Sequence, residues 1–240
     1  MERKFKNYRY EFVLAAGETK VFVLRLEYPS LRMEQPPQGE SPSWTRLSCE
    51  KCPGCPLTGG EEARCPVAVN LAPILDQVHD LFSTDMADIT ITCDDREYFK
   101  RTQVQYGVRS MIGMCMATSG CPILDKLRPM AYIHLPFPNM EETLFRSLMM
   151  YLTAQYFRMG EGQEPDWNLE SLSALYREIS RVNLAFSKRL QHAGVDDAIL
   201  NAISNLDTHG NYTAMAIGQD YLNDLKEMFE PFLEPRREEG

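Results

Sequence analysis

The sequence predicts an α+β fold, in which a small antiparallel sheet packs against a mostly helical C-terminal half. Within the first 105 residues, two pairs of segments alternate apolar and polar side chains, which is the period of a half-buried strand. From residue 139 onward, apolar residues recur every three or four positions, which is the period of a helix. Strands followed by a run of helices are typical of α+β proteins.

The predicted sheet consists of two hairpins. Residues 6–14 and 19–28 alternate on either side of a turn at residues 15–18, with Tyr8, Tyr10 and Phe12 on one face of the first strand. The second hairpin pairs residues 89–93 with residues 97–102 around Asp94 and Asp95.

Helical spacing accounts for most of the remaining chain. One helix begins near Pro66 and accepts Pro73 in its first turn, because proline is tolerated there but not in a helix interior. A second helix begins at Val104 and ends before Gly120. Asn139 and Glu142 have the spacing of a capping box at the start of another helix. Three further helices are predicted at about residues 168–192, 196–207 and 217–231.

The chain divides by composition into a cysteine-rich α+β region, residues 1–138, and a helical region, residues 139–240. A single compact domain fits the same pattern, because 240 residues can bury one large core. Within the first region, residues 45–66 form a loop rich in cysteine, proline and glycine.

The net charge of −9 is unevenly distributed. Residues 1–120 carry 14 basic and 16 acidic side chains, whereas residues 121–240 carry 11 and 18. An acidic half repels phosphate backbones, so we expect a protein partner rather than a nucleic acid. Lys100, Arg101 and Arg109 form a small basic patch, which we interpret as solvated.

The sequence predicts a cytoplasmic protein. No stretch of 18 apolar residues is present, so we expect no membrane-spanning helix. The first twelve residues lack the apolar segment of a secretory signal. In a reducing compartment, the seven cysteines indicate free thiols or metal ligands rather than disulfides.

Four cysteines are each followed directly by proline, far more than 15 prolines in 240 residues would produce by chance. Proline stiffens the backbone and holds the preceding residue extended, which suits a metal ligand. We call these four residues the Cys-Pro quartet: Cys52, Cys55, Cys65 and Cys121. Four thiolates are the ligand set of a closed structural zinc site, so zinc is the predicted cofactor.

Alternatives to this zinc site remain open. Cys49 or His134 could replace Cys121 as the fourth ligand. The spacing Cys49-x-x-Cys52-x-x-Cys55 is also that of an iron–sulfur motif, which would make the protein a redox protein or sensor. The cysteines could also bind no metal and only stiffen the loop. A further alternative is an enzyme whose pocket joins Cys121 to His134, although the sequence favours a protein without catalytic activity.

A polar residue lies near the apolar stripe of one predicted helix. Asn183 lies beside Val182 and three positions before Phe186 in the long helix predicted at residues 168–192. Such a position could line a pocket between helices, but we interpret it as part of a solvated face.

The segments CPGCPL, CPVAVNLAPILD, MATSGCP and RPMAYIHLPFPNMEETLFRSL resemble a family of uncharacterised bacterial proteins classed as a domain of unknown function. The resemblance covers about residues 6–232 and implies a bacterial, cytoplasmic domain that spans most of the chain. It implies no activity. The residues themselves favour a binding or regulatory module with one structural metal ion.

Overall fold

The computed structural model describes residues 4–35, 41–78, 80–194, 197–217 and 222–233, and it confirms the α+β fold. Five antiparallel strands form one sheet in the order β3-β2-β1-β4-β5. Their bounds are Lys4–Leu14 (β1), Thr19–Tyr28 (β2), Arg32–Met33 (β3), Met86–Cys93 (β4) and Arg96–Gln103 (β5). Both predicted hairpins are present, and β1 joins them by pairing with β2 and β4.

The alternation seen in the sequence selects which face of the sheet is buried. Tyr8, Tyr10 and Phe12 of β1 are fully buried on one face. In the register, Tyr10 lies opposite Phe22 of β2 and Ile91 of β4, both of which are also buried. Cross-strand pairs of aromatic and β-branched residues stabilise such a sheet.

Helix α2 (Val104–Thr118) lies between the sheet and α5 (Asp197–Ile217), because it contacts β1, β4 and β5 as well as α5. Gly107 permits this approach to the sheet: a Cβ atom there would lie 2.6 Å from Cε1 of Phe12 and 2.8 Å from Cδ1 of Ile89. Gly120, with φ of +88°, follows the end of α2 as predicted.

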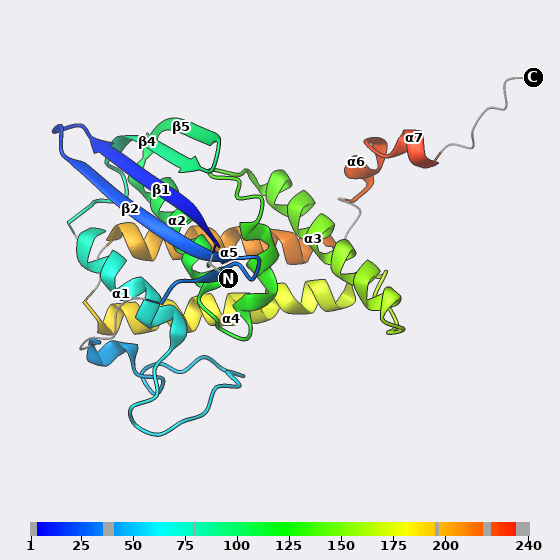
Figure 1. Cartoon of the computed structure of the whole chain (residues 1–240), viewed down its shortest axis with the longest axis horizontal. Coiled ribbons are helices and arrows are strands. Elements are labelled where there is room, and N and C mark those ends of the chain that lie inside the picture. Colours follow the sequence, from blue (N-terminus) through cyan, green and yellow to red (C-terminus); the bar gives the residue numbers. More distant parts are fainter. Residues whose placement is uncertain (1–3, 36–40, 79, 195–196, 218–221, 234–240) are drawn as a thin grey trace, which may run out of the picture.

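The C-terminal half is helical, as predicted. Figure 1 shows α4 below the sheet and α3 to its right. The capping box is confirmed, since the Asn139 side chain accepts from the amide of Glu142 and the Glu142 carboxylate accepts from the amide of Asn139. The helix bounds are Met140–Gly160 (α3), Glu170–His192 (α4), Asp197–Ile217 (α5), Leu222–Glu227 (α6) and Glu230–Leu233 (α7).

One helix prediction was wrong in its limits, and another in the position of a proline within the helix. The helix predicted at residues 196–207 continues to Ile217, because Gly210 is accommodated beside Tyr176 without ending the helix. Helix α1 (Pro66–Val78) begins at Pro66, so Pro73 lies inside it rather than in its first turn. Proline at the first helical position favours this early start, at the cost of one intrahelical hydrogen bond at Pro73.

One continuous hydrophobic cluster contains residues from both sides of position 138, including Phe12 and Ile91 of the sheet and Leu172 and Phe186 of α4. The division into residues 1–138 and 139–240 stays a prediction. Within the described ranges, no helix combines the length and the apolar character that crossing a membrane requires.

Candidate functional site

The cysteine-rich loop is closed at its base by backbone pairing. The amide of Leu47 donates to the carbonyl of Ala63, and the amide of Cys65 donates to the carbonyl of Thr45, at 2.7 and 2.9 Å. Figure 1 shows the loop at the lower edge of the molecule, below α4. This closure fixes Cys65 at the start of α1, next to the core.

Arg189 of α4 fastens the same loop base to the helical half. Its guanidinium donates to the carbonyl oxygens of Trp44, Arg46 and Leu47 at 2.9, 2.6 and 3.5 Å, and the residue is 1% exposed. The Arg189 charge also lowers the pKa of Cys52 slightly against the larger effects that raise it. The loop is therefore held beside a buried cation.

Cys52 and Cys55 lie on either side of a tight turn. The amide of Cys55 donates to the carbonyl of Cys52 at 3.1 Å, with Pro53 and Gly54 at the two central positions. Gly54 has φ of +76°, which a type II turn requires at its third position and which glycine adopts without strain. Both cysteines are half-buried and pack against the core.

Cys121 follows the left-handed Gly120 at the end of α2 and begins the segment that leads into the 3-10 helix η2 (Leu124–Ala131). The backbone amides of Leu124 and Ile123 donate to its sulfur and lower its pKa, whereas burial has the larger effect and raises it. Amides that point at a cysteine sulfur stabilise its thiolate form. Cys121 is 8% exposed.

The fold brings the Cys-Pro quartet into one neighbourhood. Burial raises the pKa of Cys52 to about 11, and the leading charges that add to this effect belong to Cys65, Cys55 and Cys121. The charges of Cys65 and Cys55 likewise raise the pKa of Cys121. Pro53 and Pro56 share one surface hollow with Pro122. Segments that are 56 residues apart in the chain therefore lie side by side.

The quartet is close but is not arranged as a finished metal site. Among the described residues, no group of three or more His, Cys, Asp or Glu side chains has the geometry of a metal-binding cluster. All four sulfurs are free thiols. Cys49 is half-buried and, despite its position three residues before Cys52, is not among the leading charges that act on Cys52.

His134, a candidate ligand and candidate catalytic partner of Cys121, lies in different surroundings. Its Nε2 is 2.8 Å from the hydroxyl of Tyr10 and 3.1 Å from Oγ of Ser110. Burial, with a smaller effect from the charge of Arg146, lowers its pKa to about 3, so the ring is neutral. In the described part of the chain no hydrogen bond joins His134 to Cys121, and the geometry gives no support to a Cys–His couple.

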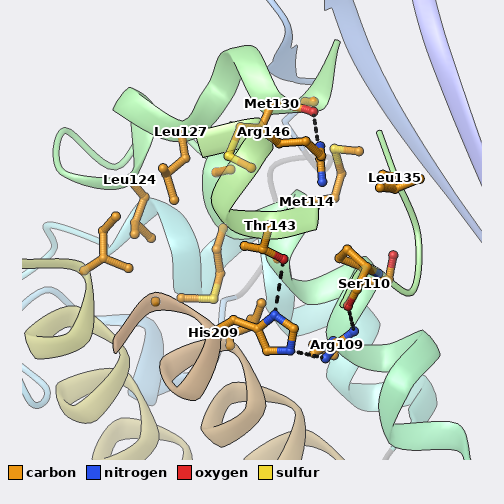
Figure 2. Close-up of a pocket in the computed structure, with 18 of the residues that line it drawn as sticks. Arg109, Ser110, Met114, Leu124, Leu127, Met130, Leu135, Thr143, Arg146 and His209 are labelled. Carbon is orange, nitrogen blue, oxygen red and sulfur yellow. Dashed lines mark hydrogen bonds between the residues drawn. The ribbon is translucent and has the colours of Figure 1, made fainter. Parts of the chain in front are cut away.

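A second feature is a cavity of about 170 Å³ that is lined by α2, α3, α4, α5 and η2 and opens to the surface. Its wall is mostly apolar and includes the flexible side chains of Met114, Met116 and Met130. His134 lines this cavity, but Cys121 does not. Figure 2 shows Leu124 and Leu127 of η2 on one side and His209 of α5 on another.

A chain of hydrogen bonds crosses the cavity wall. Arg109 of α2 donates to Nε2 of His209 at 2.8 Å, so Nδ1 of the neutral His209 carries the proton and donates to Thr143 at 3.2 Å (Figure 2). Thr143 donates in turn to the carbonyl of Asn139 at 2.8 Å. Burial and the Arg109 charge lower the pKa of His209 to about 4, which keeps the ring neutral. The direction of every bond in this chain is thus determined.

The sequence-based interpretation of two cavity residues was wrong. Arg109 and Asn183 were interpreted as solvated, but they are 6% and 2% exposed and line the cavity. Arg109 directly follows Val108 and Asn183 directly follows Val182, and both valines are buried. This position next to an apolar residue of the helix was the signal in the sequence that could have indicated burial. Arg146 of α3, which lines the same cavity, carried no signal in the sequence that we recognised.

The fold and these two features define a class: an α+β protein with a thiol-rich loop held against α4 and an apolar cavity lined by α2, η2 and the C-terminal helices. A family model described as a domain of unknown function, DUF6901, matches residues 7–230. The chain therefore belongs to this family, as the sequence motifs suggested. Neither a curated protein nor a solved structure matches the chain.

Proposed function

We propose that the Cys-Pro quartet binds one structural zinc ion, and that the protein is a binding or regulatory module whose cysteine-rich loop this ion fixes to the body of the fold. The observation that supports this is the convergence of the four sulfurs from three separate segments. Thiolate ligands and a closed site without a water position serve folding rather than catalysis.

The electrostatics of the quartet favour a cation. Burial and mutual charge raise the pKa of Cys52 and Cys121, so four thiolates without a metal would repel one another in a poorly hydrated place. A divalent ion reverses this effect, because each thiolate then gains an attractive partner. The amides that point at Cys121 favour the same deprotonated state.

The proposal requires a small rearrangement, because the sulfurs are not already at coordination distance. The turn at Pro53 and Gly54 is half-exposed or exposed, whereas Cys65 and Cys121 are buried next to the core. We therefore assign the movement to the turn, which closes onto the two buried cysteines when zinc binds. The ion would then join the loop, the start of α1 and the end of α2.

The test is elemental analysis of the purified protein together with two matched variants. We expect about one zinc per chain in the wild type, loss of that zinc in Cys55→Ser, and retention in Cys49→Ser, which changes a cysteine of the same loop outside the quartet. Cys55→Ser should also lower the melting temperature. Unchanged zinc content in Cys55→Ser would contradict the proposed ligand set.

An iron–sulfur cluster is the alternative that the same experiment separates. Iron and sulfide in protein purified without oxygen, with loss of colour in Cys49→Ser, would assign the Cys49-containing motif instead. Absence of any metal from the wild type, after reconstitution with zinc and with iron, would overturn both.

The partner follows from the charge distribution. We infer that the acidic half, residues 121–240, faces a protein partner, since its 18 acidic and 11 basic side chains repel nucleic acid. Zinc would act at a distance from this surface by holding Cys121 and the end of α2 in place. The proposal thus makes the ion structural and leaves recognition to the helices.

A further inference from the structure

We propose that the cavity between α2, α3, α4, α5 and η2 binds a small organic carboxylate, with an apolar body of about the size of one aromatic ring. This site is separate from the Cys-Pro quartet and does not depend on zinc. Three observations carry the proposal: a buried and a half-buried guanidinium group without a carboxylate among the described residues, an amide without a hydrogen bond to a described residue, and an apolar cavity of matching size.

The cavity wall contains two arginines without a counter-ion. Among the described residues, Arg109 donates to His209 and to the carbonyl of Pro138 and lies over the ring of Tyr106. Arg146 donates to the carbonyls of Met130 and Ile133. Neither forms an ion pair with a described residue, and burial lowers the pKa of both. Arg109 is buried and Arg146 is half-buried. Charges withdrawn from water are normally paired, so the missing anion is informative in a protein that carries nine excess negative charges.

The nearest carboxylate to Arg146 does not fill this role. The charge of Glu142 reaches Arg146 weakly, but the Glu142 carboxylate is exposed and accepts from the amide of Asn139 in the capping box. Both hydrogen bonds of Arg146 to described residues come from Nη2, which leaves Nη1 and Nε free to donate. Nη1 can therefore donate a charge-assisted hydrogen bond to one oxygen of a ligand carboxylate.

Asn183 of α4 supplies an independent indication of a polar ligand. The residue is 2% exposed and lines the cavity, yet its carboxamide makes no hydrogen bond to any described residue. The described residues supply this amide with no acceptor, so it is available to donate to a ligand in the cavity. A ligand oxygen in the cavity would accept from this amide.

The apolar part of the cavity wall determines which apolar group of a ligand fits. A cavity of about 170 Å³ is slightly larger than the cavity of about 150 Å³ that is known to hold one benzene molecule. Methionine sulfurs interact favourably with aromatic rings, and Met114, Met116 and Met130 all line the cavity. The chemistry therefore points to a benzoate-like carboxylate rather than to an inorganic anion or a long chain.

The test compares benzoate with benzamide, which has the same shape and no charge, by isothermal titration calorimetry on the full chain. We expect benzoate to bind and benzamide to bind at least about tenfold more weakly, since a charge-assisted hydrogen bond contributes on this order. Equal affinity for the two probes, or no heat from either at millimolar concentration, would overturn the proposal.

Two variants distinguish a binding site from a purely structural arrangement. Asn183→Leu removes no hydrogen bond to a described residue, so the unliganded protein should be equally or more stable while benzoate affinity falls about tenfold. Arg146→Met should lose the preference for benzoate over benzamide. Arg177→Met, an exposed arginine of α4 outside the cavity wall, is the control and should bind benzoate like the wild type. Unchanged benzoate affinity in Asn183→Leu and Arg146→Met would place any binding elsewhere.

Discussion

Arg189 shows how one side chain can join two parts of the molecule. It is fully enclosed on α4, yet its three acceptors are carbonyl groups at the base of the cysteine-rich loop. Backbone carbonyls in a loop lack the partners that a helix or sheet supplies, so a buried guanidinium satisfies several at once. The same cation lies near Cys52, where it opposes the rise in pKa caused by burial.

We predict that Arg189→Met lowers the free energy of unfolding by about 3 kcal/mol, because it leaves buried carbonyl groups without donors. Urea unfolding followed by circular dichroism measures this change. Lys188→Met, an exposed neighbour on the same helix, should change stability by less than about 0.5 kcal/mol. Equal stability of the two variants would show that the contacts of Arg189 contribute little.

At the scale of elements, glycines within helices have different roles that depend on what each helix touches. Gly107 of α2 faces two rigid side chains of the sheet, whereas Gly210 of α5 has one neighbour, Cδ1 of Tyr176, at an ordinary 3.5 Å. The sequence shows only that both glycines lie within stretches of helical spacing. The distance between the helix and its neighbour decides whether glycine is required.

We predict opposite effects of the same substitution at these two positions. Gly107→Ala should lower the free energy of unfolding by about 2 kcal/mol, because the new methyl group overlaps Phe12 and Ile89. Gly210→Ala should raise it by up to about 1 kcal/mol, because alanine has the higher helix propensity and space for its Cβ atom. Chemical denaturation of both variants under identical conditions provides the comparison, and a stabilised Gly107→Ala would contradict the close packing of α2 on the sheet.

At the scale of the whole molecule, two neutral histidines, the buried His134 and the half-buried His209, link stability to pH. Burial lowers the pKa of His134 to about 3 and of His209 to about 4, with smaller effects from Arg146 and Arg109. His134 also faces Tyr10 and Ser110, and His209 faces Thr143. In the unfolded chain, both imidazoles bind protons near pH 6.5. Their contribution is therefore present above pH 6.5 and is lost as the pH falls toward 4 and then 3.

We predict that stability falls between pH 7 and pH 5, with each histidine contributing up to about 1.4 kcal/mol per pH unit once the unfolded chain is protonated. Urea midpoints at pH 7, 6 and 5 measure the slope. His134→Gln should flatten it, because it removes one of the two groups that bind protons only after unfolding. Equal slopes in the wild type and His134→Gln would contradict a neutral buried His134.

Local patterns were sufficient for much of the fold. Alternation over residues 6–14 and 19–28 predicted the first hairpin, and the pair Asn139 and Glu142 predicted the start of α3. The C-terminal limit of α5 was missed, because the helix continues through Gly210, where a Cβ atom would have space beside Tyr176. Hairpins and caps depend on neighbouring residues, so the sequence encodes them locally.

For the candidate sites too, some features follow from the sequence and others only from the tertiary structure. The sequence by itself determined the motif family, the hairpins, the helix starts and the unusual set of four Cys-Pro pairs. Only the tertiary structure decided that Cys121 lies near Cys52, that His134 lies apart from both, and that Arg109, Arg146 and Asn183 share one cavity. The physical reason is that burial and proximity between distant segments arise from packing, and packing depends on the whole chain rather than on local spacing.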